Sequence, residues 1–402
     1  MLIPIHWMKD VKEQLDKDVR LGVLEQVPIG EPVQWCSRMV VCPKKDGKPR
    51  RTVDLSKLNK VSARQTHPTE SPFNQAVSVP KNTYKTVLDC WEGYHSVPLA
   101  EEDRPYTRFV TPFGLYQYLT SPQGFLASGD GYTSRYDKIV AGFGNFTKCV
   151  DDTLLWDSTL GEIFFRTCQY LTLCSSHGII FNKKKFKFGE KEVEFLGFEI
   201  TSDSVRPSSS FLEAIQDFPQ PRDITGIRSW FGLINQVSYA FSMTEIMRPF
   251  RDLLKPTTEF NWTEELQEAF EKSKEVIIEA VKDGIMTFEM DRTTCLATDW
   301  SKQGIGFALL QKYCDCRDIT PICCSTGWKL VFAGSRFTSD AESRYSPVEG
   351  EALAAVFGLK RAKHFTLGCT DLVLAVDHMP LLGILGNKNL DEVENPRLQR
   401  KL

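Results

Sequence analysis

The stretch TKCVDDTLLW, residues 147–156, places two adjacent aspartates, Asp151 and Asp152, inside a mostly apolar segment. Neighbouring carboxylates repel each other, and burying either one without a partner costs free energy. A surface turn explains one of the two acids, whereas a cation that both of them bind explains the pair. The apolar residues on either side read as two strands, so we predict a hairpin with both acids at its turn.

Length and composition limit the class of protein. A chain of 402 residues is too long for one compact core and predicts two or three domains. Its content of 42% hydrophobic and 25% charged residues is typical of soluble globular proteins. No apolar run approaches the roughly 18–20 residues that span a bilayer, and the opening MLIPIHWMKD reaches an acidic residue too early for a signal peptide. Most of the twelve cysteines are scattered, so we expect a reducing, cytoplasmic location and no secretion.

Two basic tracts stand out against a formal net charge of −3. They are KKDGKPRR at residues 44–51 and NKKKFKF at residues 182–188. Each is explained by a solvated hairpin tip or helix end, and each also has the composition of a loop that contacts phosphates. Because the net charge is slightly negative, a nucleic-acid partner has to be bound by local basic tracts of this kind.

The hydrophobic pattern predicts a mixture of helices and strands. In the first half we predict helices over residues 8–26 and 162–178 and strands over residues 37–43, 51–55, 84–91 and 193–200. Residues 208–282 are mainly helical in pattern. A second alternating region follows, with strands at 295–300 and 304–312, a long connection, a helix at 347–365 and a strand at 372–378.

Three carboxylates follow or end predicted strands in the first half: Asp89, Asp151 and Asp152. Acids that converge from different strands can share hard divalent cations, and two such cations favour an in-line phosphoryl displacement. Surface turns remain the alternative explanation for these acids.

Six sequence motifs follow one another along the chain. Their occurrence together in this order identifies a protein family more specifically than any single motif does. They are KKDGKPRRTVDLSKLNK (44–60), KTVLDCWEGYHSVPL (85–99), TPFGLYQYLTSPQG (111–124), CVDD (149–152), GIIFNKKKFKF (178–188) and EFLGFEI (194–200). This series resembles the reverse transcriptase and RNase H region of Pol polyproteins from gypsy-type LTR retrotransposons, and more distantly from retroviruses. The resemblance implies an α+β fold: a right-hand polymerase of fingers, palm and thumb, followed by an RNase H-like α/β domain.

The resemblance also implies roles for individual residues. Asp89, Asp151 and Asp152 match the catalytic acids that bind two Mg²⁺ ions, with Mn²⁺ as a substitute. The residues that match contacts to the incoming deoxynucleoside triphosphate are Lys44, Lys45, Arg50, Tyr94 and Gln123. Tyr94 matches the aromatic side chain that crowds the sugar 2′ position, with a core aromatic as the alternative. Cys149 replaces the family's usual aromatic residue before the acidic pair.

The second half matches RNase H at three acids. Asp299 and Asp377 follow the pattern of acids at strand ends, and Glu351 aligns with the helical acid. We expect the neighbouring Glu349 to be an exposed residue in the first turn of that helix. The family's fourth acid lies on a later helix, and the sequence ends at Leu402 before such a helix. We therefore expect a truncated RNase H-like domain with an incomplete metal site and weak hydrolysis of the RNA strand.

These matches divide the chain into three parts. Residues 1–205 are expected to form fingers and palm, residues 206–284 thumb and connection, and residues 285–402 the RNase H-like domain. The implied partners are an RNA or DNA template–primer, deoxynucleoside triphosphates and other Pol modules such as protease and integrase, with no membrane. An active element would place the protein in a virus-like particle. The alternative function is a decayed or domesticated fragment that binds nucleic acid without catalysis.

One group of cysteines departs from the scattered pattern: Cys314, Cys316, Cys323 and Cys324. Four thiols within eleven residues can bind Zn²⁺ tetrahedrally. The spacing differs from the usual paired Cys-x-x-Cys, so a disulfide and ordinary reduced cysteines remain alternatives.

Overall fold

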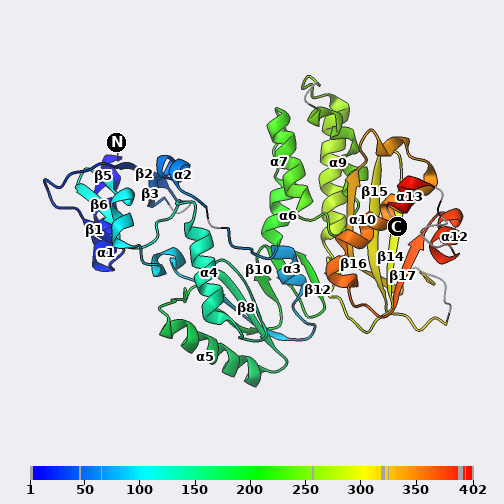
Figure 1. The fold of residues 1–402 in the computed structure, drawn as a ribbon, viewed down its shortest axis with the longest axis horizontal. Coiled ribbons are helices and arrows are strands. Elements are labelled where there is room, and N and C mark those ends of the chain that lie inside the picture. Colours follow the sequence, from blue (N-terminus) through cyan, green and yellow to red (C-terminus); the bar gives the residue numbers. More distant parts are fainter. Residues whose placement is uncertain are drawn as a thin grey trace. The chain divides into compact units, whose positions relative to one another are not determined.

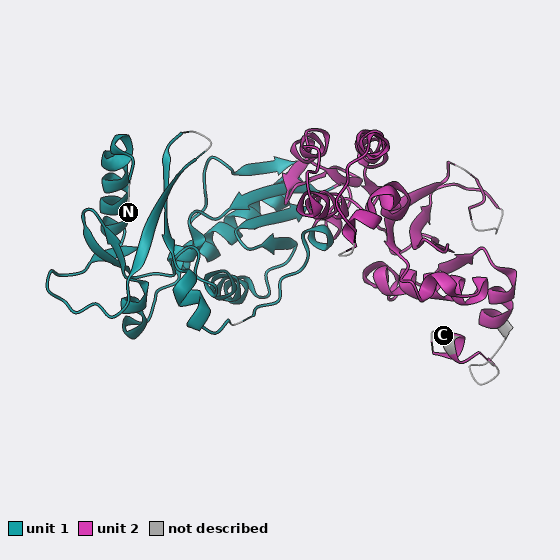
Figure 2. Cartoon of the chain, turned by 90° about the horizontal axis from the view of Figure 1, so that it is seen from above, with its two compact units in different colours: residues 1–75, 83–191 teal, residues 76–82, 192–402 magenta. Residues whose placement is uncertain are grey.

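The computed structural model describes residues 3–44, 47–64, 66–255, 258–317, 322–324, 326–387, 393 and 395–400. Figure 2 shows the chain as two compact units, residues 1–75 with 83–191 and residues 76–82 with 192–402. Helices and sheets alternate in both units, which confirms the predicted α+β class (Figure 1). Among the described residues, no helix combines the length and the apolar character that crossing a membrane requires.

The first unit contains two sheets with separate hydrophobic cores. The five-stranded sheet has the order β1-β6-β5-β2-β3, and the four-stranded sheet has the order β7-β8-β4-β9. The strands are β1 Leu24–Gln26, β2 Ser37–Pro43, β3 Pro49–Asp54, β4 Tyr84–Asp89, β5 Phe109–Thr111, β6 Gly114–Tyr118, β7 Phe146–Cys149, β8 Asp152–Asp157 and β9 Lys187–Glu190. The helices are α1 Met8–Arg20, α2 Ser56–Val61, α4 Ser128–Val140 and α5 Leu160–Ser176, with 3-10 helices η1 Ile5–Trp7, η2 Gly93–Ser96 and η3 Glu101–Thr107. Helix α3 Pro72–Val77 begins in this unit, and its last two residues belong to the second unit.

Helices α4 and α5 pack against the four-stranded sheet (Figure 1). Their buried face includes three tyrosines, Tyr132, Tyr136 and Tyr170. Tyr170 donates to the Tyr136 hydroxyl at 3.0 Å, and Tyr136 lies 3.1 Å from the Thr153 hydroxyl on β8. Because buried hydroxyls need hydrogen-bond partners, this chain of contacts fixes β8 against both helices. The strand that carries Asp152 is therefore supported from beneath.

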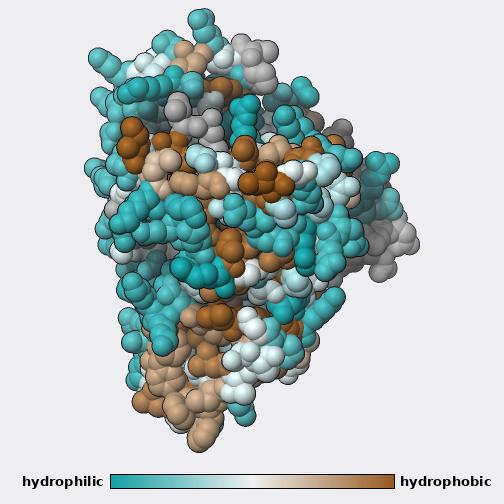
Figure 3. All heavy atoms as spheres, turned by 90° about the vertical axis from the view of Figure 1, so that its left-hand side faces the viewer, coloured by the Kyte–Doolittle hydropathy of each residue, from teal (hydrophilic) through white to brown (hydrophobic). Residues whose placement is uncertain are grey.

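The helix α5 leaves an apolar strip outside that core. Leu160, Phe164 and Phe165 are all exposed, and the Phe164 ring makes an edge contact with Phe188 of the basic tract. Figure 3 shows tan and brown spheres at the lower end of the face it presents, while hydrophilic side chains cover much of the rest. Apolar atoms contribute more than half of the accessible surface of a typical folded protein, so a strip of three exposed apolar residues is not unusual.

The second unit begins with a four-stranded sheet and a helical segment. The sheet has the order β10-β11-β12-β13, with strands β10 Val193–Phe195, β11 Phe198–Ile200, β12 Ser204–Pro207 and β13 Ile285–Met286. The helices are α6 Ser209–Gln216, α7 Ile224–Asn235, α8 Met243–Met247 and α9 Glu264–Val281, with 3-10 helices η4 Arg248–Phe250 and η5 Asp252–Leu254. The helical pattern expected over residues 208–282 is thus confirmed.

The same unit ends in a second four-stranded sheet of order β16-β15-β14-β17. Its strands are β14 Thr294–Trp300, β15 Gly304–Lys312, β16 Trp328–Phe337 and β17 Leu372–Val376. The helices are α10 Pro347–Arg361, α11 Lys363–Thr366, α12 Met379–Asn387 and α13 Pro396–Gln399, with η6 Glu342–Arg344. β14 pairs antiparallel with β15 and parallel with β17, so β14 and β17 end at the same edge of the sheet.

Three sequence predictions about these elements are wrong. The helix expected over residues 8–26 ends at Arg20, because Gly22 adopts a φ of 70° and residues 24–26 pair with β6. The strand expected over residues 193–200 is a hairpin, since Leu196 and Gly197 both have positive φ and turn the chain between β10 and β11. The long connection expected after residue 312 contains the strand β16.

An ion pair between β16 and η6 gives a testable pH dependence. Arg336 donates from two nitrogens to both carboxylate oxygens of Glu342, at 2.7 and 2.8 Å, and this hydrogen bonding lowers the Glu342 pKa to about 2. The Glu342 pKa is lower in the folded protein than in the unfolded chain, where it is near 4.5. The ionised carboxylate therefore stabilises the folded protein above pH 4.5, and this stabilisation is lost as the pH falls toward 2. We expect Glu342→Gln to reduce the free energy of unfolding by about 1–2 kcal/mol at pH 7.

Urea unfolding followed by circular dichroism at several pH values measures this difference. The difference in the free energy of unfolding between the parent protein and Glu342→Gln should become smaller below about pH 4.5. The exposed Glu268 on α9 provides the matched control, and Glu268→Gln should leave stability within about 0.5 kcal/mol of the parent. A gap for Glu342→Gln that stayed constant from pH 7 to pH 2 would contradict the ionic explanation.

Candidate functional site

The hairpin that carries the acidic pair is built by a strained two-residue turn. β7 and β8 pair with Cys149 opposite Asp152, which leaves Val150 and Asp151 in the turn. Val150 has a φ of 53°, a conformation that β-branched residues rarely adopt. Strain of this kind collects where the surrounding structure holds the backbone in one geometry. The hairpin was predicted correctly, but Asp152 begins the strand and only Asp151 lies in the turn.

The adjacent strand brings the third acid to the same place. Asp89, the last residue of β4, pairs directly with Asp152 of β8, and the Cys90 amide donates to the Asp151 carbonyl oxygen at 2.8 Å. The structure therefore gathers Asp89, Asp151 and Asp152 at one end of two paired strands.

Electrostatics at this end of the sheet favour a bound cation. Burial, followed by repulsion from neighbouring carboxylates, raises the pKa values of Asp151 and Asp152. Within the part of the chain that the structure describes, the buried Oδ1 of Asp151 has no hydrogen-bond partner. Lys185 donates to Asp89 at 2.6 Å and supplies a positive charge beside the acids. A buried, unpartnered carboxylate oxygen among three acids fits the hard-oxygen coordination that Mg²⁺ requires.

Close packing holds the turn in position. A Cβ atom on Gly93 of η2 would lie 2.7 Å from Oδ1 of Asp151 and 2.5 Å from the Tyr132 ring, so only glycine fits there. The next residue, Tyr94, is half-buried with its ring edge-on to Tyr132 at a centroid distance of 5.6 Å. Burial, with a smaller contribution from the Asp151 charge, raises the Tyr94 pKa. Tyr94 therefore lies in the electrostatic neighbourhood of the acidic site.

A polar cavity of about 480 Å³ brings together three residues that the resemblance assigned to nucleotide binding. Lys44, Arg50 and Gln123 all line it. Lys45, the alternative to Lys44, lies outside the described residues. The cavity is also lined by residues that the sequence did not single out, namely Lys17, Asp18, Arg51, Glu92 and His95.

Arg51 is the most informative of these additional residues. One nitrogen of its largely buried guanidinium group binds Asp18, whereas Nε and Nη1 have no partner among the described residues. Arg51 directly follows Arg50 in the first basic tract, and both residues line the cavity. Asp18 lies 33 residues away in the sequence, so no local sequence pattern predicts its ion pair with Arg51.

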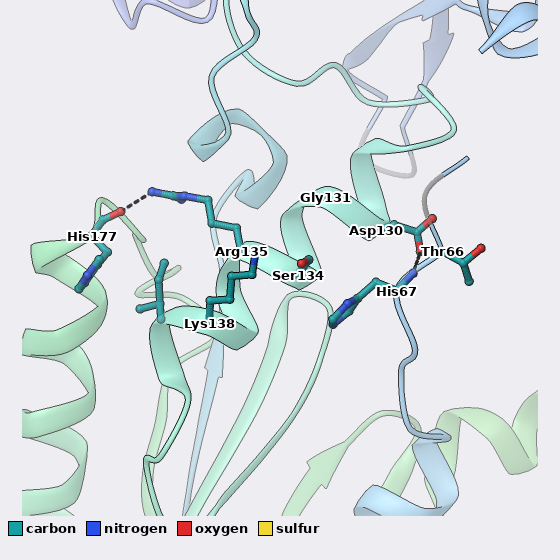
Figure 4. A pocket seen from close by; sticks show the side chains of 9 residues that line it. Thr66, His67, Asp130, Gly131, Ser134, Arg135, Lys138 and His177 are labelled. Carbon is teal, nitrogen blue, oxygen red and sulfur yellow. Dashed lines mark hydrogen bonds between the residues drawn. The ribbon is translucent and has the colours of Figure 1, made fainter. Parts of the chain in front are cut away.

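A separate cavity of about 580 Å³ lies along the outer face of α4. Its basic lining comprises Arg135, Lys138, His67 and His177, with Asp130 as an acid. Figure 4 shows Arg135 extending toward His177, whose carbonyl oxygen accepts a hydrogen bond from Arg135 at 2.9 Å. Asp130 accepts a hydrogen bond from Arg64 at 2.8 Å. The helix α4 runs through Asp130 and Gly131, although both are poor helix formers.

The second unit gathers the other three predicted acids. Thr298 pairs with Val376, so the next residues on these parallel strands, Asp299 and Asp377, are neighbours at the sheet edge. Glu351 on α10 is buried, and desolvation followed by repulsion from Asp299 and Asp377 raises its pKa to about 7. Its Oε2 is a buried oxygen without a hydrogen-bond partner among the described residues. This donor set also fits divalent cations.

Glu349 differs from its prediction. It is only 8% exposed, and its carboxylate completes a capping box with Ser346 and accepts a hydrogen bond from Asn395 at 3.1 Å. The expectation of an exposed acid is therefore wrong. Asn395, far along the chain, covers this end of α10, and no local pattern predicts that contact.

Comparisons with known proteins match a family to each half of the chain. Residues 42–200 match the reverse transcriptase (RNA-dependent DNA polymerase) family, and residues 289–402 match the RNase H-like domain found in reverse transcriptases. Two curated relatives are the transposon Tf2-3 polyprotein of Schizosaccharomyces pombe, 24% identical over 99% of this chain and 29% of its own length, and the retrovirus-related Pol polyprotein from transposon 297 of Drosophila melanogaster, 28% identical over 92% and 34%.

Solved structures show the same fold. A foamy viral protease–reverse transcriptase dRH in complex with double-stranded DNA has a TM-score of 0.83 and 20% identity, and covers 100% of this chain and 68% of that chain. A foamy viral protease–reverse transcriptase in complex with an RNA/DNA hybrid has a TM-score of 0.77 and 20% identity, over 99% and 53%.

The chain is therefore a reverse transcriptase domain followed by an RNase H-like domain. Along nearly its whole length it is similar to the Pol polyproteins of retrotransposons, as the sequence motifs predicted. It spans about three-tenths of the length of the curated relatives.

Proposed function

We propose that the protein is an RNA-directed DNA polymerase that extends a primer on an RNA or DNA template. The observation that carries this proposal is the convergence of Asp89, Asp151 and Asp152 at one end of two paired strands. Its sequence family and the nucleic-acid complexes of its structural neighbours support the same function.

In this proposal the three acids bind the metal ions, and the residues that line the polar cavity bind the nucleotide. Asp89, Asp151 and Asp152 would hold two Mg²⁺ ions, which when bound activate the primer 3′-hydroxyl and neutralise the triphosphate. Lys44 and Arg50 bind and orient the phosphates from the rim of the 480 Å³ cavity. Gln123, which lines the same cavity, contacts the nucleotide. Tyr94 restricts the space at the sugar 2′ position.

The basic residues around α4 supply the second binding element. Arg135 and Lys138 line a cavity in the same unit as the acids, and their charge suits the phosphates of a template–primer. Protease and integrase modules, a cytoplasmic location and a virus-like particle fit the Pol relatives and form part of the same proposal.

Primer extension tests this function directly. Purified protein with a DNA primer on an RNA template, deoxynucleotides and Mg²⁺ should extend the primer, and Mn²⁺ should substitute. A protein that binds the primer–template but does not extend it under either metal would instead support the non-catalytic, nucleic-acid-binding alternative.

We further propose that Asp299, Glu351 and Asp377 form the metal site for cleavage of RNA in an RNA–DNA hybrid. The support is the buried, unpartnered Oε2 of Glu351 beside two acids at a sheet edge.

Two aspartates at opposite ends of β17 give a matched test. We expect Asp377→Asn to lower hybrid cleavage at least about 10²-fold, because a metal ligand and its charge are lost, while primer extension is unchanged. Asp371→Asn, just before the other end of the strand, should leave both activities intact. Cleavage is measured on a labelled hybrid with Mg²⁺ or Mn²⁺. Robust cleavage that survives Asp377→Asn would remove this residue from the site.

A further inference from the structure

The four cysteines that stand apart in the sequence flank the ends of two paired strands. Two of them follow β15 and two precede β16, and β15 and β16 pair as far as Lys312 opposite Trp328. The two chain segments therefore leave the sheet side by side. We call Cys314, Cys316, Cys323 and Cys324 the four-cysteine cluster.

The sulfur atoms of this cluster converge on one point. All four Sγ atoms lie within 4.8 Å of one another, and those of Cys314 and Cys323 are 3.5 Å apart. Four thiolates at about 2.3 Å from one tetrahedral zinc are separated from each other by about 3.8 Å. A disulfide would require about 2.05 Å instead. The spacing is thus that of thiols arranged around a common centre.

Gly327, three residues after Cys324, leaves room for this arrangement. A Cβ atom on Gly327 would lie 2.5 Å from Sγ of Cys314 and 2.6 Å from Sγ of Cys324. Both distances are far shorter than a sulfur–carbon contact allows, so any side chain at this position would displace the sulfurs. The backbone therefore approaches the cluster as closely as glycine permits.

A neighbouring indole donates a hydrogen bond to one of the sulfur atoms. Trp328 donates from Nε1 to Sγ of Cys323 at 3.4 Å. Donors of this kind around a metal-binding sulfur orient the ligand and stabilise its charged form.

The cluster is also tied to the body of the second unit. The Tyr313 amide donates to the Gly327 carbonyl oxygen at 2.6 Å, and the Tyr313 hydroxyl donates to Glu289 at 2.9 Å. Arg292 lies over the Tyr313 ring at 4.0 Å. The two segments that bear the cysteines therefore start from anchored backbone, which lowers the entropic cost of bringing four thiols together.

We propose that the four-cysteine cluster binds one structural Zn²⁺ ion. Four Zn–S bonds form, and each thiol releases its proton to solvent. Because four protein ligands fill the tetrahedral shell, the site is closed and structural, with no position for a substrate. Its effect is to join the ends of β15 and β16 in the RNase H-like domain.

Metal analysis of the unaltered chain tests the proposal without any substitution. Protein purified in a non-thiol reductant should retain about one zinc per chain after dialysis. Replacement of zinc by Co²⁺ should give strong thiolate-to-cobalt charge-transfer absorption and the intense visible bands of a tetrahedral site. Less than about 0.1 zinc per chain, together with no such absorption on Co²⁺ addition, would overturn it.

Three variants locate the site. Cys323→Ser should lower zinc affinity at least tenfold, and Gly327→Ala should lower it about tenfold while the circular dichroism spectrum is retained. Cys369→Ser, in the same domain but outside the cluster, is the matched control and should bind zinc like the parent. Equal zinc affinity in all three variants would show that the metal binds elsewhere. A Cys314–Cys323 disulfide in peptides from the freshly isolated protein, with no zinc retained after reduction, would identify a redox pair and reject the proposal.

Discussion

Replacing Asp151 by asparagine should reduce primer extension at least about 10³-fold. The substitution keeps the size of the side chain but removes its charge and one of its acceptor oxygens. Asp151 has a buried oxygen without a hydrogen-bond partner among the described residues, and its burial already raises its pKa. A group held in this way is costly to the folded protein unless a cation binds it. The neutral amide should therefore fold well and fail in catalysis.

The far end of the same hairpin strand offers the control. Asp157 ends β8 and pairs with Arg166 on α5. Asp157→Asn should lower the melting temperature because it weakens this ion pair, yet it should leave the extension rate within a few-fold of the parent. Single-nucleotide incorporation at saturating Mg²⁺ measures both variants. Extension by Asp151→Asn at the parental rate would refute the assignment of the acids.

Replacing Tyr94 by alanine should lower the preference for deoxynucleotides over ribonucleotides about 10–100-fold, which corresponds to about 1–3 kcal/mol of steric exclusion. The ring is half-buried, stands edge-on to Tyr132 and lies near the Asp151 charge, so it borders the acidic site. Its removal opens space where a 2′-hydroxyl would otherwise collide. The incorporation of ribonucleotides should rise much more than the incorporation of deoxynucleotides changes.

Tyr94→Phe separates the ring from its hydroxyl. It should keep the parental discrimination, because the excluded volume is almost the same. The ratio of incorporation rates for matched deoxy- and ribonucleotides is the measurement for both variants. If Tyr94→Ala lowered the two rates equally, Tyr94 would be a core aromatic that supports η2, as its contact with Tyr132 also allows.

The local sequence pattern was sufficient to predict those elements whose structure is decided by residues that are near one another in the sequence. The apolar strands around Asp151 and Asp152 predicted the hairpin, and the family resemblance carried by the ordered motifs implied the α+β class and a shared role for the three acids. The register that places Asp89 opposite Asp152 follows from strands whose apolar residues must face one core. Where the local sequence pattern is this strong, the structure confirms the prediction made from it.

Contacts between distant residues account for most of what the sequence did not show. Residues 24–26 fall within a helical pattern, yet pairing with β6 makes them a strand. Asp18 finds Arg51, and Asn395 covers Glu349, only after the chain has folded. The two positive φ values at Leu196 and Gly197 turn an apparently continuous strand into a hairpin. In the first three cases the deciding partner lies outside the window that a local pattern covers, whereas the turn at Leu196 and Gly197 is local and joins two adjacent short strands.

The crossing of residues 76–82 into the second unit has a consequence for anyone who wishes to produce the halves separately. This short segment interrupts the first unit, and within the second unit Lys81 pairs with Glu289 at 2.5 Å while the Asn82 amide donates to the Ser202 carbonyl oxygen at 2.7 Å. The polypeptide thus passes between the units three times, and no single cleavage point divides it cleanly. A fragment that stops at residue 191 would leave the Lys81 ammonium without its carboxylate and the Asn82 amide without its acceptor. Expression of either half alone therefore calls for a redesigned loop in place of residues 76–82.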